Sequence, residues 1–130
     1  MVLSITILCL ACKKEDGNTE RFNLLTSHLW VSDSLLVAGQ DASGPGQLLE
    51  NFVGDASFRK DGTGYFGKYQ GSWYFTNNEN YITINSDSLL LPLTSMIREL
   101  TQVSFKITTS FPNQADPGNP FDIRITFKAK

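Results

Sequence analysis

Several residue types that support particular functions are scarce in this chain of 130 residues. His28 is the single histidine, which excludes a metal site built from several histidines. The 11 Lys and Arg residues stand against 13 Asp and Glu residues, so the net charge is −2 and no basic excess attracts nucleic acid. We therefore expect no metal, no cofactor and no nucleic-acid partner.

Motifs for catalysis are also missing. Ser27, His28 and Asp33 are close in sequence, but no Gly-x-Ser-x-Gly elbow exposes a nucleophile. The stretch 62–67 has the glycine spacing of a dinucleotide fingerprint, yet strand-like residues follow it where that motif requires a helix. The carboxylates stand mainly at turn or solvent-facing positions, and none forms an evident acid and base pair. We predict that the protein is not an enzyme.

No hydrophobic run is long enough to cross a bilayer, which takes about 20 apolar residues. Residues 1–11 are a short apolar stretch that ends in Ala11 before Cys12, a shape typical of a secretory signal. Polar, loop-like residues follow. The pattern predicts a signal peptide over 1–11, a flexible tether over 12–19 and one folded domain over 20–130. The alternative is an apolar first strand that contains two cysteines.

The triplet Leu10-Ala11-Cys12 resembles the lipobox of bacterial lipoproteins. The resemblance implies that Cys12 becomes the acylated N-terminus and that the protein is held at a membrane by its lipid. Residues 13–16, two lysines and two acids, resemble the signal that sends some lipoproteins to the surface of the Gram-negative outer membrane. We expect a surface-exposed lipoprotein there, with the periplasmic face as the alternative. Cys9 would leave with the signal, so the domain would keep no free thiol.

Short strands dominate the rest of the pattern. Thr19 is a suitable N-cap for a short helix over 20–25, and a hydrophobic period near two follows it. Asp61-Gly62 is expected to supply the positive φ angles of a tight hairpin. Residues 96–100 fit a helical turn or a strand equally well, and Pro92 places 89–93 at an edge, a bulge or an irregular crossing. The expected strands are 30–37, 48–53 (less clearly), 56–60, 63–66, 72–76, 81–85, 103–108 and 121–128.

The last two of these strands have the clearest alternation. Val103, Phe105 and Ile107 alternate with polar residues, as do the apolar residues of 121–127. One face of each strand should therefore be buried and the other wet. The three prolines of 112–120 enforce a loop between them. Hairpin-connected strands in this number predict an all-β domain, either an antiparallel barrel of about eight strands or a β-sandwich.

The order of these features resembles the lipocalin-like domains of bacterial lipoproteins. The features are residues 25–30 opening the first strand, the hairpin 58–63, Gly71-Ser72-Trp73, residues 97–101 before a penultimate strand, and the alternating C-terminal strand. His28 replaces the glycine that lipocalins typically have two residues before the first tryptophan. The resemblance implies an up-and-down barrel with a mouth at one end, which often encloses a small apolar ligand and performs no chemistry.

Aromatic side chains are the remaining candidates for function. They face inward together in this interpretation, and they form either a packed barrel interior or the wall of an apolar pocket. We expect a monomer that holds a small apolar or amphipathic ligand in the barrel mouth. The alternative is a solid-core module that binds a partner protein or a glycan through loops 42–47 and 112–120. The candidate residues are Trp30, Phe58, Trp73, Phe75, Phe105 and Phe127.

Overall fold

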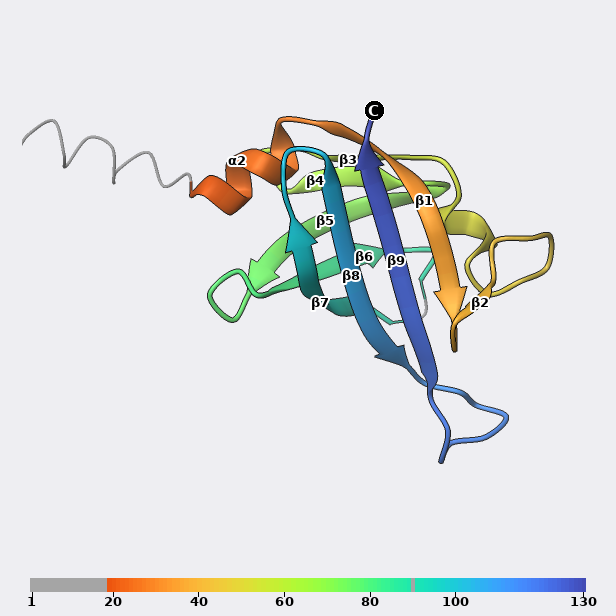
Figure 1. Cartoon of the computed structure of the whole chain (residues 1–130). Coiled ribbons are helices and arrows are strands. Elements are labelled where there is room, and N and C mark those ends of the chain that lie inside the picture. Colours follow the sequence, from red (N-terminus) through yellow and green to blue (C-terminus); the bar gives the residue numbers. More distant parts are fainter. Residues whose placement is uncertain (1–18, 90) are drawn as a thin grey trace, which may run out of the picture.

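The protein is an antiparallel β-barrel with one short helix (Figure 1). The computed structural model describes residues 19–89 and 91–130. One sheet contains all nine strands, in the order β2-β1-β3-β4-β5-β6-β7-β8-β9. The elements are α2 (Glu20–Thr26), β1 (Leu29–Val37), β2 (Gln40–Asp41), the 3-10 helix η1 (Glu50–Phe52), β3 (Asp55–Phe58), β4 (Thr63–Phe66), β5 (Tyr69–Thr76), β6 (Tyr81–Ser86), β7 (Leu93–Leu100), β8 (Ser104–Phe111) and β9 (Phe121–Ala129).

Strand β1 closes the sheet into a barrel. Its first residues pair with β3, while nearly its whole length pairs with β9 at the other end of the strand order. The two-residue β2 pairs only with the end of β1, so eight of the nine strands form the ring. Closure distinguishes this fold from the alternative β-sandwich, because every long strand has a neighbour on both sides. The all-β class and the barrel predicted from the sequence are confirmed.

The predicted N-terminal helix is present as α2. The Thr19 hydroxyl accepts a hydrogen bond from the Phe22 amide, as an N-cap should. Of the helix residues only Leu25 is fully buried, and the Trp30 indole donates to its carbonyl oxygen over 3.0 Å. Helix α2 thereby caps one end of the barrel (Figure 1). Within the described ranges, no helix has the length and apolar character needed to cross a bilayer.

The prediction of a strand over residues 48–53 is wrong. This segment contains η1, and the two residues that it buries are Leu49 and Phe52. Their spacing of three suits a 3-10 turn, in which such residues lie on one side, and not a strand of period two. A side-chain hydrogen bond favours the compact turn, because the Glu50 carboxylate accepts from the Gly46 amide. The turn brings Leu49 and Phe52 over one end of the barrel.

The hairpin between β3 and β4 is confirmed, but its turn differs from the prediction. The loop has four residues, Arg59 to Gly62, and only Gly62 has a positive φ, at 90°. Asp61 acts through its carboxylate instead, which accepts from the amide and the hydroxyl of Thr63. An aspartate that binds the backbone two residues ahead stabilises the turn without adopting a positive φ itself.

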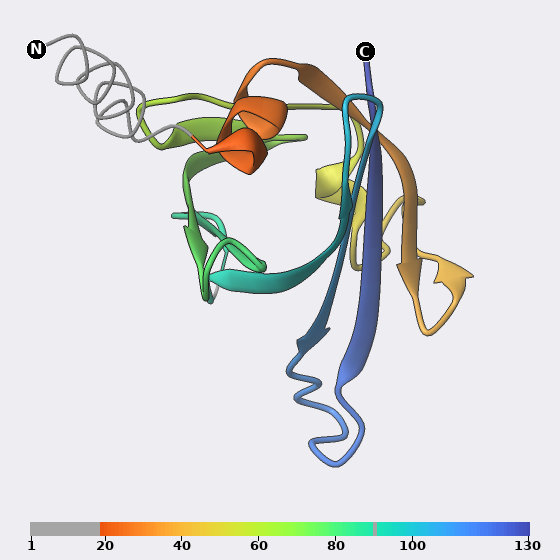
Figure 2. The same ribbon diagram turned by 60° about the vertical axis from the view of Figure 1, so that its left-hand side comes forward.

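Strands β7, β8 and β9 complete the wall. The ambiguous residues 96–100 belong to β7. Alternation along β8 and β9 is confirmed, but the placement of Val103 on the buried face is wrong, because this residue precedes β8 in the turn after β7 and is 68% exposed. Phe105, Ile107, Ile123, Ile125 and Phe127 are all buried. The hairpin of β8 and β9 extends past the rest of the barrel and carries the proline-rich loop at its tip (Figure 2). This loop is exposed over most of its length.

Candidate functional site

The barrel has two ends of different character. One end is capped by α2 and filled with aromatic rings. The opposite end, which we call the mouth, opens beside η1 and contains an apolar pocket of about 190 Å³. The lining of this mouth pocket is hydrophobic except for Ser88 and the Tyr69 hydroxyl. Its residues are Leu48, Leu49, Phe52, Tyr69, Ser88, Leu89, Leu93, Phe111 and Ile123.

Loop residues and strand ends build the mouth pocket together. Leu93, Phe111 and Ile123 come from the mouth ends of β7, β8 and β9, where alternation turns them inward. Phe52 of η1 packs on the Tyr69 ring with 4.7 Å between centroids. The backbone amide of Lys68 donates to the Asn51 carbonyl oxygen over 2.8 Å, and this hydrogen bond fixes the η1 segment to the barrel rim. The η1 segment therefore narrows the mouth and supplies three of the nine residues that line the pocket.

Four of the six predicted aromatic residues form the filled interior. Trp30, Phe58, Phe105 and Phe127 are each at most 2% exposed. Phe105 and Phe127 stack with 5.6 Å between centroids, and the Phe58 ring meets both edge-on at 5.6 and 6.4 Å. None of these four residues lines the mouth pocket or either of the two hollows described below. They are core residues.

The other two predicted aromatics lie where α2 meets the sheet. Trp73 packs against Phe58 on one side and Phe22 of α2 on the other, at 5.9 and 5.8 Å. Phe75 is half-buried and packs edge-on against Trp73 at 5.2 Å. With Phe22 they line a shallow hollow of about 250 Å³ beside the β3–β4 turn. The structure thus brings all six residues into one chain of ring contacts. Phe58 meets Trp73, Phe105 and Phe127, while Trp30 joins through Phe105 and Phe75 through Trp73.

The residues weighed for catalysis have separate partners, and no hydrogen bond or ion pair in the described part of the chain joins any two of their side chains. The Asp33 carboxylate is 3.8 Å from the Lys128 ammonium group. The His28 ring packs edge-on against Trp30 at 5.4 Å, so this histidine covers the indole where a lipocalin typically has glycine. Ser27 ends α2 as its C-cap. The stretch 62–67 belongs to a hairpin, not to a strand followed by a helix.

Hydrogen bonding perturbs two exposed carboxyl groups. The pKa of Asp61 is lowered below its ordinary value of 3.8, first by the Thr63 hydroxyl and then by the Thr63 amide. The pKa of Glu99 is also lowered, chiefly by a hydrogen bond from Ser104 and further by the charge of Lys106. Both groups are exposed turn or strand residues, so these shifts describe local structure and not a buried reactive site. Cys12, the predicted lipidation site, lies outside the described residues.

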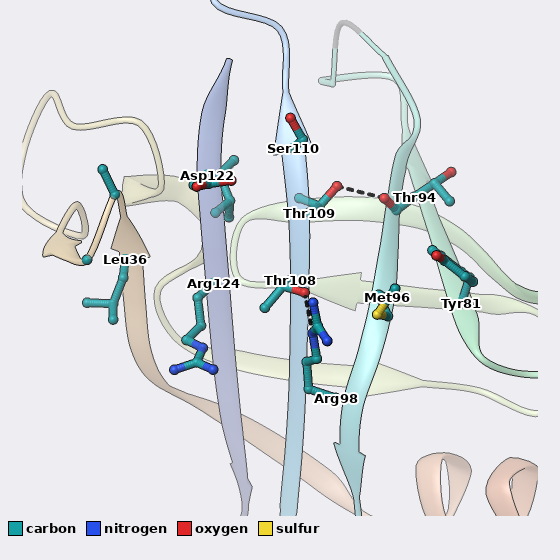
Figure 3. A pocket seen from close by; sticks show the side chains of 13 residues that line it. Leu36, Tyr81, Thr94, Met96, Arg98, Thr108, Thr109, Ser110, Asp122 and Arg124 are labelled. Atoms are coloured by element: carbon teal, nitrogen blue, oxygen red, sulfur yellow. Dashed lines mark hydrogen bonds between the residues drawn. The ribbon is translucent and has the colours of Figure 1, made fainter. Parts of the chain in front are cut away.

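A second and larger hollow lies on the outer face of the barrel (Figure 3). This outer groove has a volume of about 690 Å³ and mixes arginines, hydroxyls and apolar side chains. Sequence reasoning missed it, because it placed these outward residues only on a wet face. The lining residues are Leu36, Ala38, Gly39, Tyr81, Thr94, Met96, Arg98, Thr108, Thr109, Ser110, Asp122, Ile123 and Arg124.

The class of protein is defined by its fold. It is a small closed antiparallel barrel of eight strands with one short helix, and it is compatible with a lipocalin-like fold. No protein-family model matches the chain, and a search of curated proteins finds no match for it either.

Proposed function

We propose that this protein is a non-enzymatic, lipid-anchored lipoprotein of the cell envelope whose lipocalin-like barrel binds a small apolar or amphipathic molecule in its mouth. The observation that carries the ligand part of the proposal is the mouth pocket. Its lining is mainly aliphatic and aromatic, as in most small-molecule sites. Ser88 and Tyr69 stand at its wall as the few polar groups that would orient a ligand.

The size of the pocket limits the ligand. At about 190 Å³ it is smaller than the usual range of about 300 to 1,000 Å³ for drug-sized molecules. It is slightly larger than an apolar cavity of about 150 Å³ that accepts benzene. The aromatic interior below it leaves no continuation toward Trp30. A single small ring or the end of one acyl chain is therefore the ligand class that fits.

Titration with toluene tests this proposal. Toluene should cause saturable shifts in the methyl resonances of Leu93 and Ile123 in nuclear magnetic resonance spectra of the full chain. Leu89 lines the pocket and is half-buried, so Leu89→Glu should weaken the binding by roughly tenfold because a carboxylate must then be desolvated beside the ligand.

Leu91→Glu is the matched control. Leu91 belongs to the same loop, is 49% exposed and does not line the pocket. The same charge introduced there should leave toluene binding unchanged. If no saturable shift occurs at Leu93 or Ile123, or if both variants bind equally weakly, the mouth is not a ligand site.

The anchoring part of the proposal rests on the residues around Cys12, in particular on the lipobox-like Leu10-Ala11-Cys12. Metabolic labelling with radioactive palmitate in a Gram-negative host should label the wild-type chain, and Cys12→Ser should abolish the label. Cys9→Ser is the control, since this residue would leave with the signal peptide. Label that persists in Cys12→Ser would refute the assignment of the lipid to this cysteine.

A solid-core interaction module is the second candidate function. The observation in its favour is the filled aromatic half of the barrel, together with the exposed loop 112–120 at the tip of the projecting β8–β9 hairpin (Figure 2). In this alternative the barrel is only a rigid support, and the loop meets a partner protein or a glycan. A negative toluene titration combined with loss of a partner upon replacement of the loop would favour it.

A further inference from the structure

The outer groove forms where two neighbouring strands separate. Strands β7 and β8 pair from Leu100 and Phe105 up to Met96 and Thr108, and the pairing ends there. Residues 93–95 of β7 pair only with β6, and residues 109–111 of β8 pair only with β9. The Thr109 hydroxyl donates to the Thr94 carbonyl oxygen over 2.7 Å and bridges the gap (Figure 3). The separation hollows the outer face of the sheet.

A β-bulge directs an arginine toward this groove. The β7–β8 register shifts between Ile97 and Glu99, which leaves Arg98 as the extra residue of β7. Bulges commonly redirect a side chain at binding sites. The Arg98 Nε donates to the Thr108 hydroxyl oxygen over 2.9 Å, so the terminal nitrogens of the guanidinium stay available to a ligand.

A second arginine lies on the other side of the same threonine. Thr108 is the direct cross-strand partner of Arg124 on β9, and Figure 3 shows Arg98 and Arg124 on opposite sides of β8. Directly opposed residues in a sheet have Cβ atoms about 5 Å apart. Arg98, Thr108 and Arg124 therefore follow one another across the outer face of β7, β8 and β9, with the Arg124 side chain at the β1 side of β9 (Figure 3).

Neither of these arginines forms an ion pair with another described residue. The three ion pairs found among the described residues use lysines instead, including Lys106 with Glu99 and Lys128 with Asp33. Two arginines that flank Thr108 on neighbouring strands, neither of them in an ion pair with a described residue, are suited to a carboxylate or a phosphate, which arginine can bind through paired hydrogen bonds. An acidic group is thus the first feature of the ligand.

The rest of the groove suits a sugar. Ser110 and Asp122 are cross-strand partners beside the arginine row, and they offer a hydroxyl and an acceptor to sugar hydroxyl groups. Tyr81 and Met96, also cross-strand partners, supply an apolar surface for the carbon face of the ring. The Asp122 carboxylate would repel a ligand that carried negative charge at that position, so the acidic group must lie toward Arg98 and Arg124.

We propose that the outer groove is a binding site for an acidic sugar, with the acidic group held between Arg98 and Arg124 over Thr108. The volume of about 690 Å³ lies within the usual range for small-molecule sites, about 300 to 1,000 Å³. This site is separate from the mouth pocket, although Ile123 contributes to the walls of both. The proposal for this site does not depend on ligand binding at the mouth.

Isothermal titration calorimetry of the full chain tests the site, with glucuronate, glucose 6-phosphate and neutral glucose as probes. One or both of the acidic sugars should bind about tenfold more tightly than glucose or better, because charge-assisted hydrogen bonds from the arginines would hold the acidic group. Binding of either one supports the site and identifies the acidic group. Equal affinities for glucose and both acidic sugars, or no binding at all, would overturn the proposal. Inorganic phosphate that binds as tightly as glucose 6-phosphate would overturn the sugar part.

Substitutions locate the binding. Arg98→Gln and Arg124→Gln should each weaken the binding of the acidic sugar by about tenfold. Arg124→Lys keeps the charge without the paired donors and should fall between Arg124→Gln and wild type. Lys128→Gln is the control, since Lys128 lies on the same face of β9 outside the groove. A loss in Lys128→Gln as large as in the arginine variants would show unspecific attraction and refute the site.

Discussion

The two ends of the barrel have the same wall but opposite fillings. At the α2 end, Phe58 contacts four other rings, those of Phe66, Trp73, Phe105 and Phe127. At the mouth, one ring pair, Phe52 and Tyr69, and the separate ring of Phe111 stand among aliphatic side chains. Aromatic rings in edge-on and stacked contacts fill the α2 end of the barrel. At the mouth, leucines from the loops leave a pocket of about 190 Å³.

The covering segments differ in the same way. Helix α2 is fixed to the barrel by the indole bond to Leu25 and by the Arg21 guanidinium, which donates to the Glu79 carbonyl oxygen over 2.9 Å. The η1 segment covers the mouth with exposed residues at both sides of its buried pair, Leu48 at 43% and Val53 at 47%. Fixed contacts are thus concentrated at one end of the barrel, and the free volume of the mouth pocket lies at the other.

Paired truncations of one ring at each end test this contrast and should give the largest effect. Phe58→Ala should lower the free energy of unfolding by about 3 to 5 kcal/mol, because a fully buried ring is lost from a packed cluster. Phe111→Ala at the mouth should cost less than about 2 kcal/mol, since that ring is half-buried. Urea denaturation measures both. Equal losses would contradict the division of the barrel into a rigid and an open end.

Removal of one indole donor gives an intermediate effect. Trp30→Phe leaves the Leu25 carbonyl oxygen without the donor seen in the structure, which should cost about 1 to 3 kcal/mol. Trp73→Phe is the control, because the Arg59 carbonyl oxygen also accepts from the Gly62 amide and lies in an exposed turn. Thermal unfolding compares the two variants. A larger loss in Trp73→Phe would show that the α2 cap depends on Trp73 more than on Trp30.

The acid titration of the turn at the α2 end gives the smallest effect. The lowered pKa of Asp61 means that its carboxylate stabilises the fold above its unfolded pKa, and that this contribution disappears as the pH falls through its folded pKa. Thr63→Val removes the hydroxyl that is the main cause, so the pKa of Asp61 should rise toward 3.8. Nuclear magnetic resonance titration of the carboxyl carbon measures it. An unchanged pKa would assign the shift to the backbone amide.

Much of the fold followed from short-range pattern. The alternation of Phe105 and Ile107 with polar residues, and that of residues 121–127, fixed which face of β8 and β9 is buried, because side chains in a strand alternate strictly. Thr19 marked the start of α2 for an equally local reason, a side-chain oxygen that satisfies a free amide. By contrast, a strand was predicted for residues 48–53, although the spacing of three between Leu49 and Phe52 and the bond from the Gly46 amide to Glu50 favour the 3-10 turn that is observed.

The candidate sites could not be predicted from the sequence pattern, because they depend on residues that are distant in the sequence. Met96, Thr108, Arg124 and Leu36 lie in one row only because the registers of β7, β8 and β9 match and because β1, which is far away in the sequence, pairs with β9. The bulge at Arg98 and the separation of β7 from β8 have no local signature, since residues 96–100 fitted a helix as well as a strand. The aromatic residues were recognised as inward-facing, but whether they line a pocket depends on contacts between strands.

The sequence by itself determined the scarcity of histidine and cysteine, which is a matter of composition. It also determined the alternation of apolar and polar side chains, the helix cap and the positions of the turns, because each of these depends on neighbouring residues. Tertiary structure alone decided that β1 joins β9 to close the barrel, that rings fill one end and leave the other open, and that two arginines share one outer groove. The physical reason is that register and closure fix distances between residues that the chain separates by many positions.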